Sequence, residues 1–382
     1  MHKAARFMQG VLKNQGTFYI FGNGGSYALA RHFEATLKES LKNSSVRLRT
    51  NCGIDPCSVQ MRGKNSFANE FVNVLKPEKA NANDAILFIS GSGDSDNLIR
   101  AARYARKRGV PTVSISGFGG GKIARNETDL AIAVPINDQQ IVEDAMQSIL
   151  RLIAYATAKL AQKKRLVISK SLQTCAVQIS RGLNAMQESF VLSLAEAVSA
   201  AFSDYRGVYI LAPERGRLSF SAEHTAHNFN WDAVYQIAHP PQRRIYSTPT
   251  YCDFSGIGND RLMPGIVTVQ QLDKARPGDL LLLLVHDPQA PSVLNVLVKA
   301  RQQKMEIFLV SGKTCSKIRG VKGISLRSQS AIATPDIMQM FGHITARVLR
   351  LCIRLRLGEA KKEDIATALI EQDMAQRRLL RQ

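Results

Sequence analysis

Apolar and polar residues follow two patterns along the chain: short unbroken apolar runs, and longer segments in which apolar residues recur every three or four positions. The stretch from Asp84 to Gly117 contains one complete unit. Its apolar run 85–89 predicts a strand, a helical pattern follows after a polar loop, and the β-branched run 110–115 predicts a second strand. Strand, helix and strand in this order are typical of a parallel α/β sheet.

The same two patterns predict the other elements of the first half of the chain. Strands are expected at 18–21, 46–48 and 129–134, and helices at 3–14, 27–42, 65–75 and 140–164. A further helical stretch covers 167–202, and Gly182 is its only predicted break.

The pattern starts again at Gly207. Residues 208–216 repeat the outline of 18–26, and residues 279–312 align without gaps with 84–117, each 195 positions further along. This match predicts an internal duplication. A chain of 382 residues is long enough for the two α/β domains that such a duplication requires.

The polar loop of the central unit is the first candidate site. It holds Ser90, Gly91, Ser92, Gly93 and Ser95 between a strand and a helix. Glycine lets the backbone approach a ligand, serine donates to phosphate oxygens, and a helix amino terminus favours an anion. The loop therefore indicates a phosphate site, and the alternative is an ordinary turn in which Asp94 or Ser95 caps the helix.

A second glycine-rich turn, Gly22 to Ser26, links the strand 18–21 to its helix. Position 27 is tyrosine, so the turn lacks the glycine spacing of a dinucleotide site. Gly121-Lys122 is followed by Ile123, where a nucleotide phosphate loop needs serine or threonine. Nucleotide binding is therefore disfavoured, and no cofactor is expected.

The second copy differs from the first at the corresponding loop, which reads Val285, His286, Asp287, Pro288, Gln289, Ala290. Serine and glycine are absent from this loop, Pro288 removes an amide donor, and Asp287 would repel a phosphate. A second phosphate site is not expected there.

Composition excludes several classes of function. No apolar run approaches the roughly 18–20 residues of a membrane span, and the first residues lack the core of a signal peptide, so a cytoplasmic location without membrane binding is expected. The six cysteines contain no paired metal-ligand spacing, and Cys52 and Cys57 lack further ligands nearby, so no metal is expected.

The net charge of +20 favours anionic partners. Its basic residues come in short groups without interleaved aromatic residues, which disfavours nucleic acid without excluding it.

The turn GNGGS, the loop ISGSGDSDN and the following SG and GGG resemble the sugar isomerase (SIS) domain family, and phosphoheptose isomerases most of all. The resemblance implies an α/β fold of two flavodoxin-like, doubly wound parallel-sheet domains in tandem, the second degenerate. It implies an SIS domain at 1–165, a helical connection at 166–205 and an SIS-like domain with carboxyl-terminal helices at 206–382. It assigns phosphate binding to Ser90, Ser92 and Ser95, with the amides of Gly91 and Gly93 as further donors. It makes the first-turn residues substrate contacts, with Asn23 and Ser26 lining the sugar beside Gly24 and Gly25. Gly91 stands where the heptose enzymes usually have threonine.

The catalytic positions depart from the family pattern. Thr36 stands in place of the family's first-helix glutamate, and Ala145 in place of its histidine, whereas Glu143 is kept. Aldose–ketose isomerisation needs a base and an acid, which threonine and alanine cannot supply. Because family sites form between subunits, the second copy is a source of substitutes, His224 and His227 beside Glu223, which are spaced to share a helix face. The alternative makes these histidines structural contacts.

Three functions remain open from the sequence. The first is a phosphosugar isomerase, with sedoheptulose 7-phosphate as the expected substrate. The second is a sugar-phosphate sensor or partner-binding scaffold without turnover. The third is nucleic-acid binding, which rests on charge alone. Since the family works as tetramers of single domains, the resemblance also implies a homodimer of this chain, with four SIS units.

Overall fold

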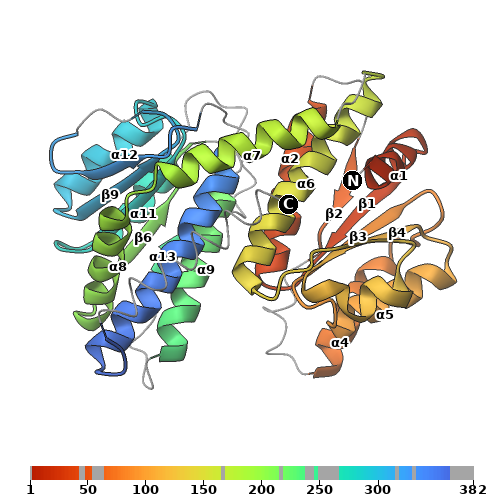
Figure 1. Cartoon of the computed structure of the whole chain (residues 1–382), viewed down its shortest axis with the longest axis horizontal. Helices are drawn as coiled ribbons and strands as arrows, with labels where there is room; N and C mark the ends of the chain where they lie inside the picture. The colour runs from red at the N-terminus through yellow and green to blue at the C-terminus, as the bar shows by residue number, and fades with distance from the viewer. Residues whose placement is uncertain are drawn as a thin grey trace. The chain divides into compact units, whose positions relative to one another are not determined.

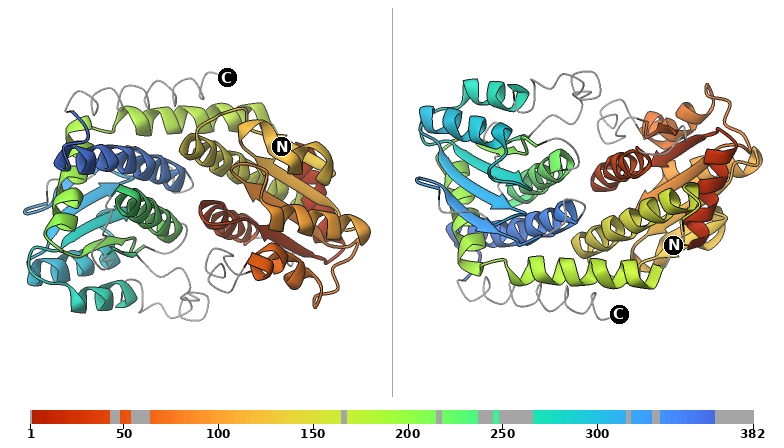
Figure 2. Two further views of the ribbon diagram at one scale, coloured as in Figure 1. Left: turned by 90° about the horizontal axis from the view of Figure 1, so that it is seen from below. Right: turned by 90° about the horizontal axis from the view of Figure 1, so that it is seen from above.

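The computed structural model describes residues 2–42, 48–53, 64–164, 168–214, 218–236, 245–247, 266–314, 318–328 and 333–361. The chain divides into two compact units, Met1–Gln173 and Thr174–Gln382. Each unit contains a five-stranded parallel sheet with helices on both of its faces (Figures 1 and 2).

The sheet of the first unit has the strand order β2-β1-β3-β4-β5. Its strands are β1 (Thr17–Phe21), β2 (Arg49–Asn51), β3 (Ala85–Ser90), β4 (Thr112–Ser116) and β5 (Leu130–Ala133). All neighbouring strands pair in parallel. This is the order of flavodoxin-like sheets, in which the chain reverses direction of winding between β1 and β3.

Helices cover both faces of this sheet because its strands are apolar on both sides. They are α1 (His2–Lys13), α2 (Gly25–Leu41) and α6 (Gln139–Ala161) on one face, and α4 (Lys64–Leu75) and α5 (Asp96–Lys107) on the other (Figure 1). Phe18 of β1 meets Phe33 of α2. On the opposite face Phe21 stacks on Phe71 of α4, with ring centroids 4.5 Å apart. Burial of such a ring contributes about 1.5–3 kcal/mol.

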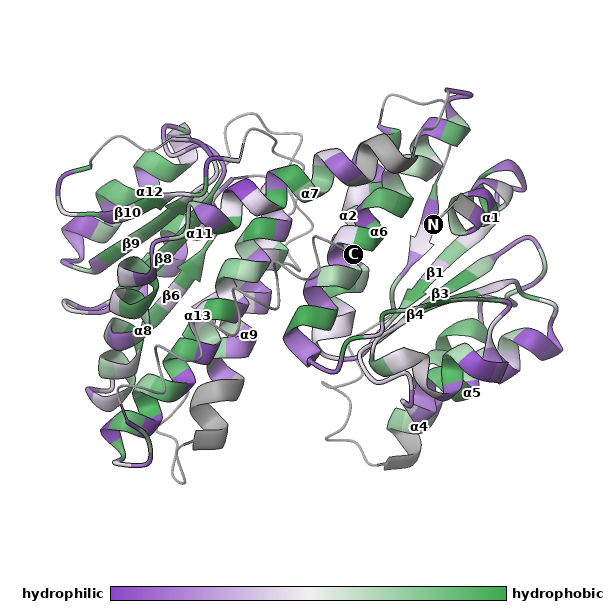
Figure 3. Cartoon of the chain, viewed as in Figure 1, coloured by the Kyte–Doolittle hydropathy of each residue, from purple (hydrophilic) through white to green (hydrophobic). Residues whose placement is uncertain are grey.

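The second unit repeats this architecture, with the strand order β10-β9-β8-β6-β7. Its strands are β6 (Val208–Leu211), β7 (Ile245–Ser247), β8 (Leu280–Val285), β9 (Glu306–Ser311) and β10 (Lys322–Ser325). Its helices are α8 (Glu188–Ser203), α9 (Leu218–Gln236), α11 (Ile266–Gln271), α12 (Pro291–Gln302) and α13 (Thr334–Arg356), and α7 (Ile168–Asn184) precedes them. Figure 3 shows that the strands are mostly hydrophobic, whereas the helices that cover them carry both hydrophobic and hydrophilic residues.

The two sheets share one hydrogen-bonding register. The β1–β3 and β3–β4 pairs of the first unit have counterparts whose residues are displaced by the offsets that the sequence predicts. The matched pairs are Phe21–Phe88 with Leu211–Leu283, and Ile86–Thr112 with Leu281–Ile307. The helices correspond as well, since α6 packs on α1 and α2 just as α13 packs on α8 and α9. The predicted fold class, two doubly wound parallel α/β domains, is confirmed.

Most predicted boundaries lie within three residues of the observed ones, and two elements differ in their place or their division. The second strand is β2 at Arg49–Asn51 rather than 46–48; Leu48 is outside the strand, and 46–47 lie outside the described residues. The stretch 167–202 divides after Asn184, whereas Gly182 lies inside α7. A side chain at Gly182 would stand 2.6 Å from Ile337 of α13, so this glycine allows close helix packing instead of ending the helix. None of the described helices combines the length and apolar character that a membrane span requires.

Candidate functional site

The candidate site lies in the first unit, beyond the carboxyl ends of β1 and β3. Because β2 lies on one side of β1 and β3 on the other, the connections leave the sheet in opposite directions at this point. Ligands of open α/β sheets bind in the crevice that results. The turn 22–24 follows β1 and the loop 91–95 follows β3, so the two sequence motifs meet at this crevice.

The serine loop, residues 90–95, is held by its own hydroxyl groups. The Gly93 amide donates to Ser90 Oγ at 2.9 Å, and the Asp94 amide donates to Ser92 Oγ at 3.2 Å. Each hydroxyl accepts one hydrogen bond and keeps its proton for donation to a ligand. The Gly93 amide, although it belongs to the predicted phosphate loop, is therefore occupied. The amides of Gly91 and Ser92 have no acceptor among the described residues.

Ser95 occupies the N-cap position of α5, but its side chain makes no capping hydrogen bond. Asp94 Oδ1 instead accepts the amide of Lys122 at 2.9 Å, which ties the loop to the segment after β4. The alternative prediction, in which Ser95 serves as a helix cap, is not what the structure contains. The Ser95 hydroxyl stands free of partners among the described residues at the amino terminus of a twelve-residue helix.

The glycine run 119–121 supports the serine loop from behind. Gly93 has a φ of +73°, and a side chain there would overlap the Gly120 carbonyl oxygen. A side chain at Gly121 would overlap the Ser92 carbonyl oxygen. The Ile123 amide donates to the Gly93 carbonyl at 3.0 Å. The backbones of the two segments are therefore in direct contact, which only glycine permits.

A reciprocal amide pair joins the first turn to α5. Asn23 Nδ2 donates to Asn97 Oδ1 at 3.0 Å, and Asn97 Nδ2 donates to Asn23 Oδ1 at 2.8 Å. Asn97 is fully buried. Asn23, which the sequence suggested as a sugar contact, therefore also fixes the position of the turn. Sequence reasoning missed Asn97, because its partner lies 74 residues away.

Glu143 and Gln139, at the start of α6, lie against the glycines of the two loops. A side chain at Gly25 would stand 2.7 Å from Glu143 Oε1, and one at Gly91 would overlap Oε1 of Gln139. Gln139 Nε2 donates to Glu143 Oε1 at 2.6 Å. The pair thus spans from the first turn to the serine loop. Sequence reasoning identified Glu143 and missed Gln139.

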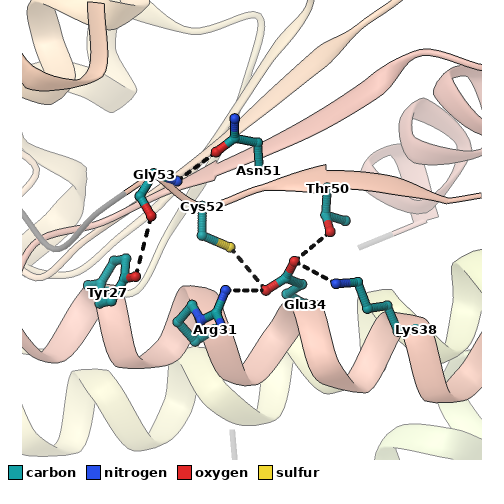
Figure 4. Close-up of polar contacts among 8 residues, drawn as sticks. All are labelled: Tyr27, Arg31, Glu34, Lys38, Thr50, Asn51, Cys52 and Gly53. Atoms are coloured by element: carbon teal, nitrogen blue, oxygen red, sulfur yellow. Dashed lines mark hydrogen bonds and ion pairs between the residues drawn. The ribbon is translucent and has the colours of Figure 1, made fainter. Parts of the chain in front are cut away.

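Thr36, in the position of the missing glutamate, is buried and donates to the His32 carbonyl of its own helix at 2.8 Å. The neighbouring acid, Glu34, does not take over the missing role. Its carboxylate binds Arg31, Lys38, Thr50 and Cys52 (Figure 4). Burial alone would raise the pKa of Glu34, but hydrogen bonds from Thr50 and Lys38 and the nearby charges lower it. A carboxylate so stabilised is a weak base.

The two histidines suggested as substitute catalysts differ in environment. His224 is buried, and its Nε2 lies 3.0 Å from Nε2 of His343 on α13. His227, one turn along α9, is exposed. The spacing predicted one shared helix face, but His224 lies on the buried face of α9 and His227 lies on its exposed side. Within the second unit, His343 is the side chain that accompanies His224, and no feature of the sequence pointed to it.

Comparison with known proteins agrees with this geometry. The SIS domain model matches residues 1–117. The phosphoheptose isomerase of Helicobacter pylori (strain Shi470) is 34% identical over 135 residues, which are 35% of this chain and 70% of that protein. The phosphoheptose isomerase of Neisseria meningitidis serogroup C (strain 053442) is 34% identical over 140 residues, 35% of this chain and 69% of that protein. The chain therefore belongs to the SIS domain family.

A solved structure extends the likeness in fold to both units. The C-terminal domain of glucosamine-fructose-6-phosphate aminotransferase from Francisella tularensis superposes with a TM-score of 0.62, at 13% identity. The match covers 92% of this chain and 88% of that chain. At this identity the comparison establishes a common fold.

Proposed function

We propose that the first unit binds a phosphorylated sugar, with the phosphate at the serine loop and the sugar toward the turn 23–26. The observation that carries the proposal is the state of the loop hydroxyls. Ser90 and Ser92 accept backbone amides and keep their protons, and Ser95 makes no cap. Three O–H donors therefore surround the amino terminus of α5, whose dipole favours an anion.

The backbone completes the proposed phosphate site. The amides of Gly91 and Ser92 have no acceptor in the part of the chain that the structure describes, so both can donate to a ligand. The turn residues Asn23, Gly24, Gly25 and Ser26 follow β1, the strand beside β3, so the hydroxyls of a sugar whose phosphate is bound at the serine loop would reach them. Hydrogen bonds to a charged group contribute about 1.5–3 kcal/mol each, more than neutral ones.

Ser95→Ala tests the proposal without disturbing the fold. The second unit has Ala290 at the equivalent N-cap, with nearly the same backbone conformation. We expect isothermal titration calorimetry to show binding of sedoheptulose 7-phosphate that Ser95→Ala weakens by about 10-fold, since one charged hydrogen bond is lost. Ser203→Ala, in α8, is the control and should bind like the parent chain. Equal affinity of the Ser95 variant and the parent, or no binding by the parent, would contradict the proposal.

Isomerisation is the second candidate, and the position of Glu143 favours it. The carboxylate lies against Gly25, and Gln139 orients it. One carboxylate can remove a proton from the carbon beside a carbonyl, with an enediolate as intermediate, and return the proton to the neighbouring carbon. The hydroxyl proton of the sugar must also pass to the former carbonyl oxygen, and protonated Glu143 or solvent water would carry it in place of the family residues that are lost at Thr36 and Ala145.

Deuterium exchange separates turnover from binding alone. In D₂O, an isomerase introduces deuterium at the carbons next to the sugar carbonyl, which NMR of the sugar phosphate detects. We expect the parent chain to do so and Glu143→Gln to lose exchange while still binding the phosphosugar. Binding without any deuterium uptake by the parent would leave the sensor function as the correct one.

A further inference from the structure

In the second unit β6 lies between β7 and β8, as β1 lies between β2 and β3 in the first, and a carboxylate from the chain lies beyond the carboxyl ends of β6 and β8. Glu214 follows β6, and its Oε1 accepts the amide of Asp287 at 3.0 Å. Its Oε2 accepts the amide of His286. Both amides belong to the loop that follows β8. The Glu214 carboxylate is therefore bound by two adjacent backbone donors, as a ligand carboxylate or phosphate would be.

The two amides that hold Glu214 are the counterparts of the two free amides of the first unit. Because β8 repeats β3 in the same register, His286 corresponds to Gly91 and Asp287 to Ser92. The helix that follows, α12, begins at the position where α5 begins. The backbone geometry of the anion site has thus survived in the second unit, although its serines have not.

The loop that holds Glu214 is fixed by other contacts as well. His286 Nδ1 lies 2.8 Å from Thr334 Oγ1, which donates to Ser328 Oγ at 3.0 Å. Lys313 Nζ pairs with the Asp287 carboxylate at 2.5 Å, which offsets the charge that the sequence predicted to repel a phosphate. The Lys313 amide donates to the His286 carbonyl at 2.7 Å. These bonds position the two amides independently of Glu214.

We infer that Glu214 is a built-in anion that occupies the second unit's phosphate-type site. The second unit therefore binds no external phosphate while Glu214 is present, and its removal opens a latent site for inorganic phosphate or a phosphate monoester. The occupancy of this site does not depend on the proposed function. The corollary, one phosphosugar bound per chain, rests on that function and on this inference together.

Phosphate titration of the full chain, followed by the amide NMR signals of both loops, tests the inference. Glu214→Ala empties the site, whereas Glu214→Gln fills it with a neutral side chain of the same size. We expect millimolar inorganic phosphate to shift His286 and Asp287 in the Ala variant and to leave them unchanged in the parent and in the Gln variant. Shifts at these residues in the parent, or none in a folded Ala variant, would overturn the inference.

Hydrogen exchange of the parent chain provides a test that needs no variant. We expect the amides of His286 and Asp287 to exchange slowly without any ligand, because Glu214 protects them. Rapid exchange of both would overturn the inference. The amides of Gly91 and Ser92 test the proposed function separately. If these two amides do not respond to phosphate while His286 and Asp287 stay protected, phosphosugar binding is contradicted and the inference about Glu214 is not.

Discussion

Asn23 and Asn97 donate their side-chain amides to each other's carbonyl oxygens, at 3.0 and 2.8 Å. The first follows β1 and the second lies in the first turn of α5. This pair couples the turn 22–24 to the helix whose amino terminus faces the proposed phosphate. The Asn97 oxygen also accepts the amide of Leu98. This half-buried contact thus joins the two motifs of the candidate site.

Asn97→Ala should destabilise the chain and weaken phosphosugar binding together. Removing the Asn97 amide leaves the Asn23 amide without its partner, at a cost of about 1–3 kcal/mol. Asn83→Ala, an exposed position, should change the free energy of unfolding by less than about 0.5 kcal/mol. Urea denaturation measures both values. An Asn97 variant as stable as the Asn83 variant would show that the reciprocal pair is dispensable.

Alanine should be tolerated at Gly91 and not at Gly93. At Gly91 the new methyl group meets the end of the flexible Gln139 side chain, which can move. At Gly93 it overlaps the Gly120 carbonyl, which is backbone, at a φ of +73°. Thermal unfolding should show a loss of about 1 kcal/mol for Gly91→Ala and of about 3 kcal/mol or more for Gly93→Ala. Equal losses would contradict the close packing of the serine loop on the glycine run.

The Glu34 network should make stability depend on pH. The pKa of Glu34 is lower in the folded chain than its ordinary value of 4.5, so its contribution is present above that value and is lost as the pH falls through the folded pKa. Glu34→Gln should therefore lower the free energy of unfolding at pH 7 by about 1.5–3 kcal/mol, the contribution of a hydrogen bond to a charged group. The difference between variant and parent should shrink as the pH falls below 4.5. A difference that stays constant with pH would mean that packing, not charge, accounts for the loss.

Local pattern was sufficient to predict the central strands of the sheets and the serine loop. The strand 85–89 and the helix after it are set by neighbouring residues, and the duplication is visible as a constant offset of 195 positions. The glycines and serines of residues 90–95 lie between these two elements, so their place at the strand end follows from the chain order alone. The fold class was predictable for the same reason.

The contacts that organise the site were not predictable, because they join residues far apart in sequence. Asn23 pairs with Asn97 across 74 residues, and Glu214 binds the amide of Asp287 across 73. A carboxylate shortly after a strand has no local feature that marks it as an internal ligand. The Glu34 network was missed for the same reason. Its partners Thr50 and Cys52 lie in or next to β2, and the sequence does not show that β2 pairs with β1 near α2.

A crystal structure of the chain with sedoheptulose 7-phosphate tests the central claim most directly. The account predicts one phosphosugar per chain, with its phosphate within hydrogen-bonding distance of the hydroxyls of Ser90, Ser92 and Ser95 and of the Gly91 and Ser92 amides. It also predicts that Glu214 stays bound to the amides of His286 and Asp287. A phosphate bound elsewhere, or one at the second loop with Glu214 displaced, would contradict it.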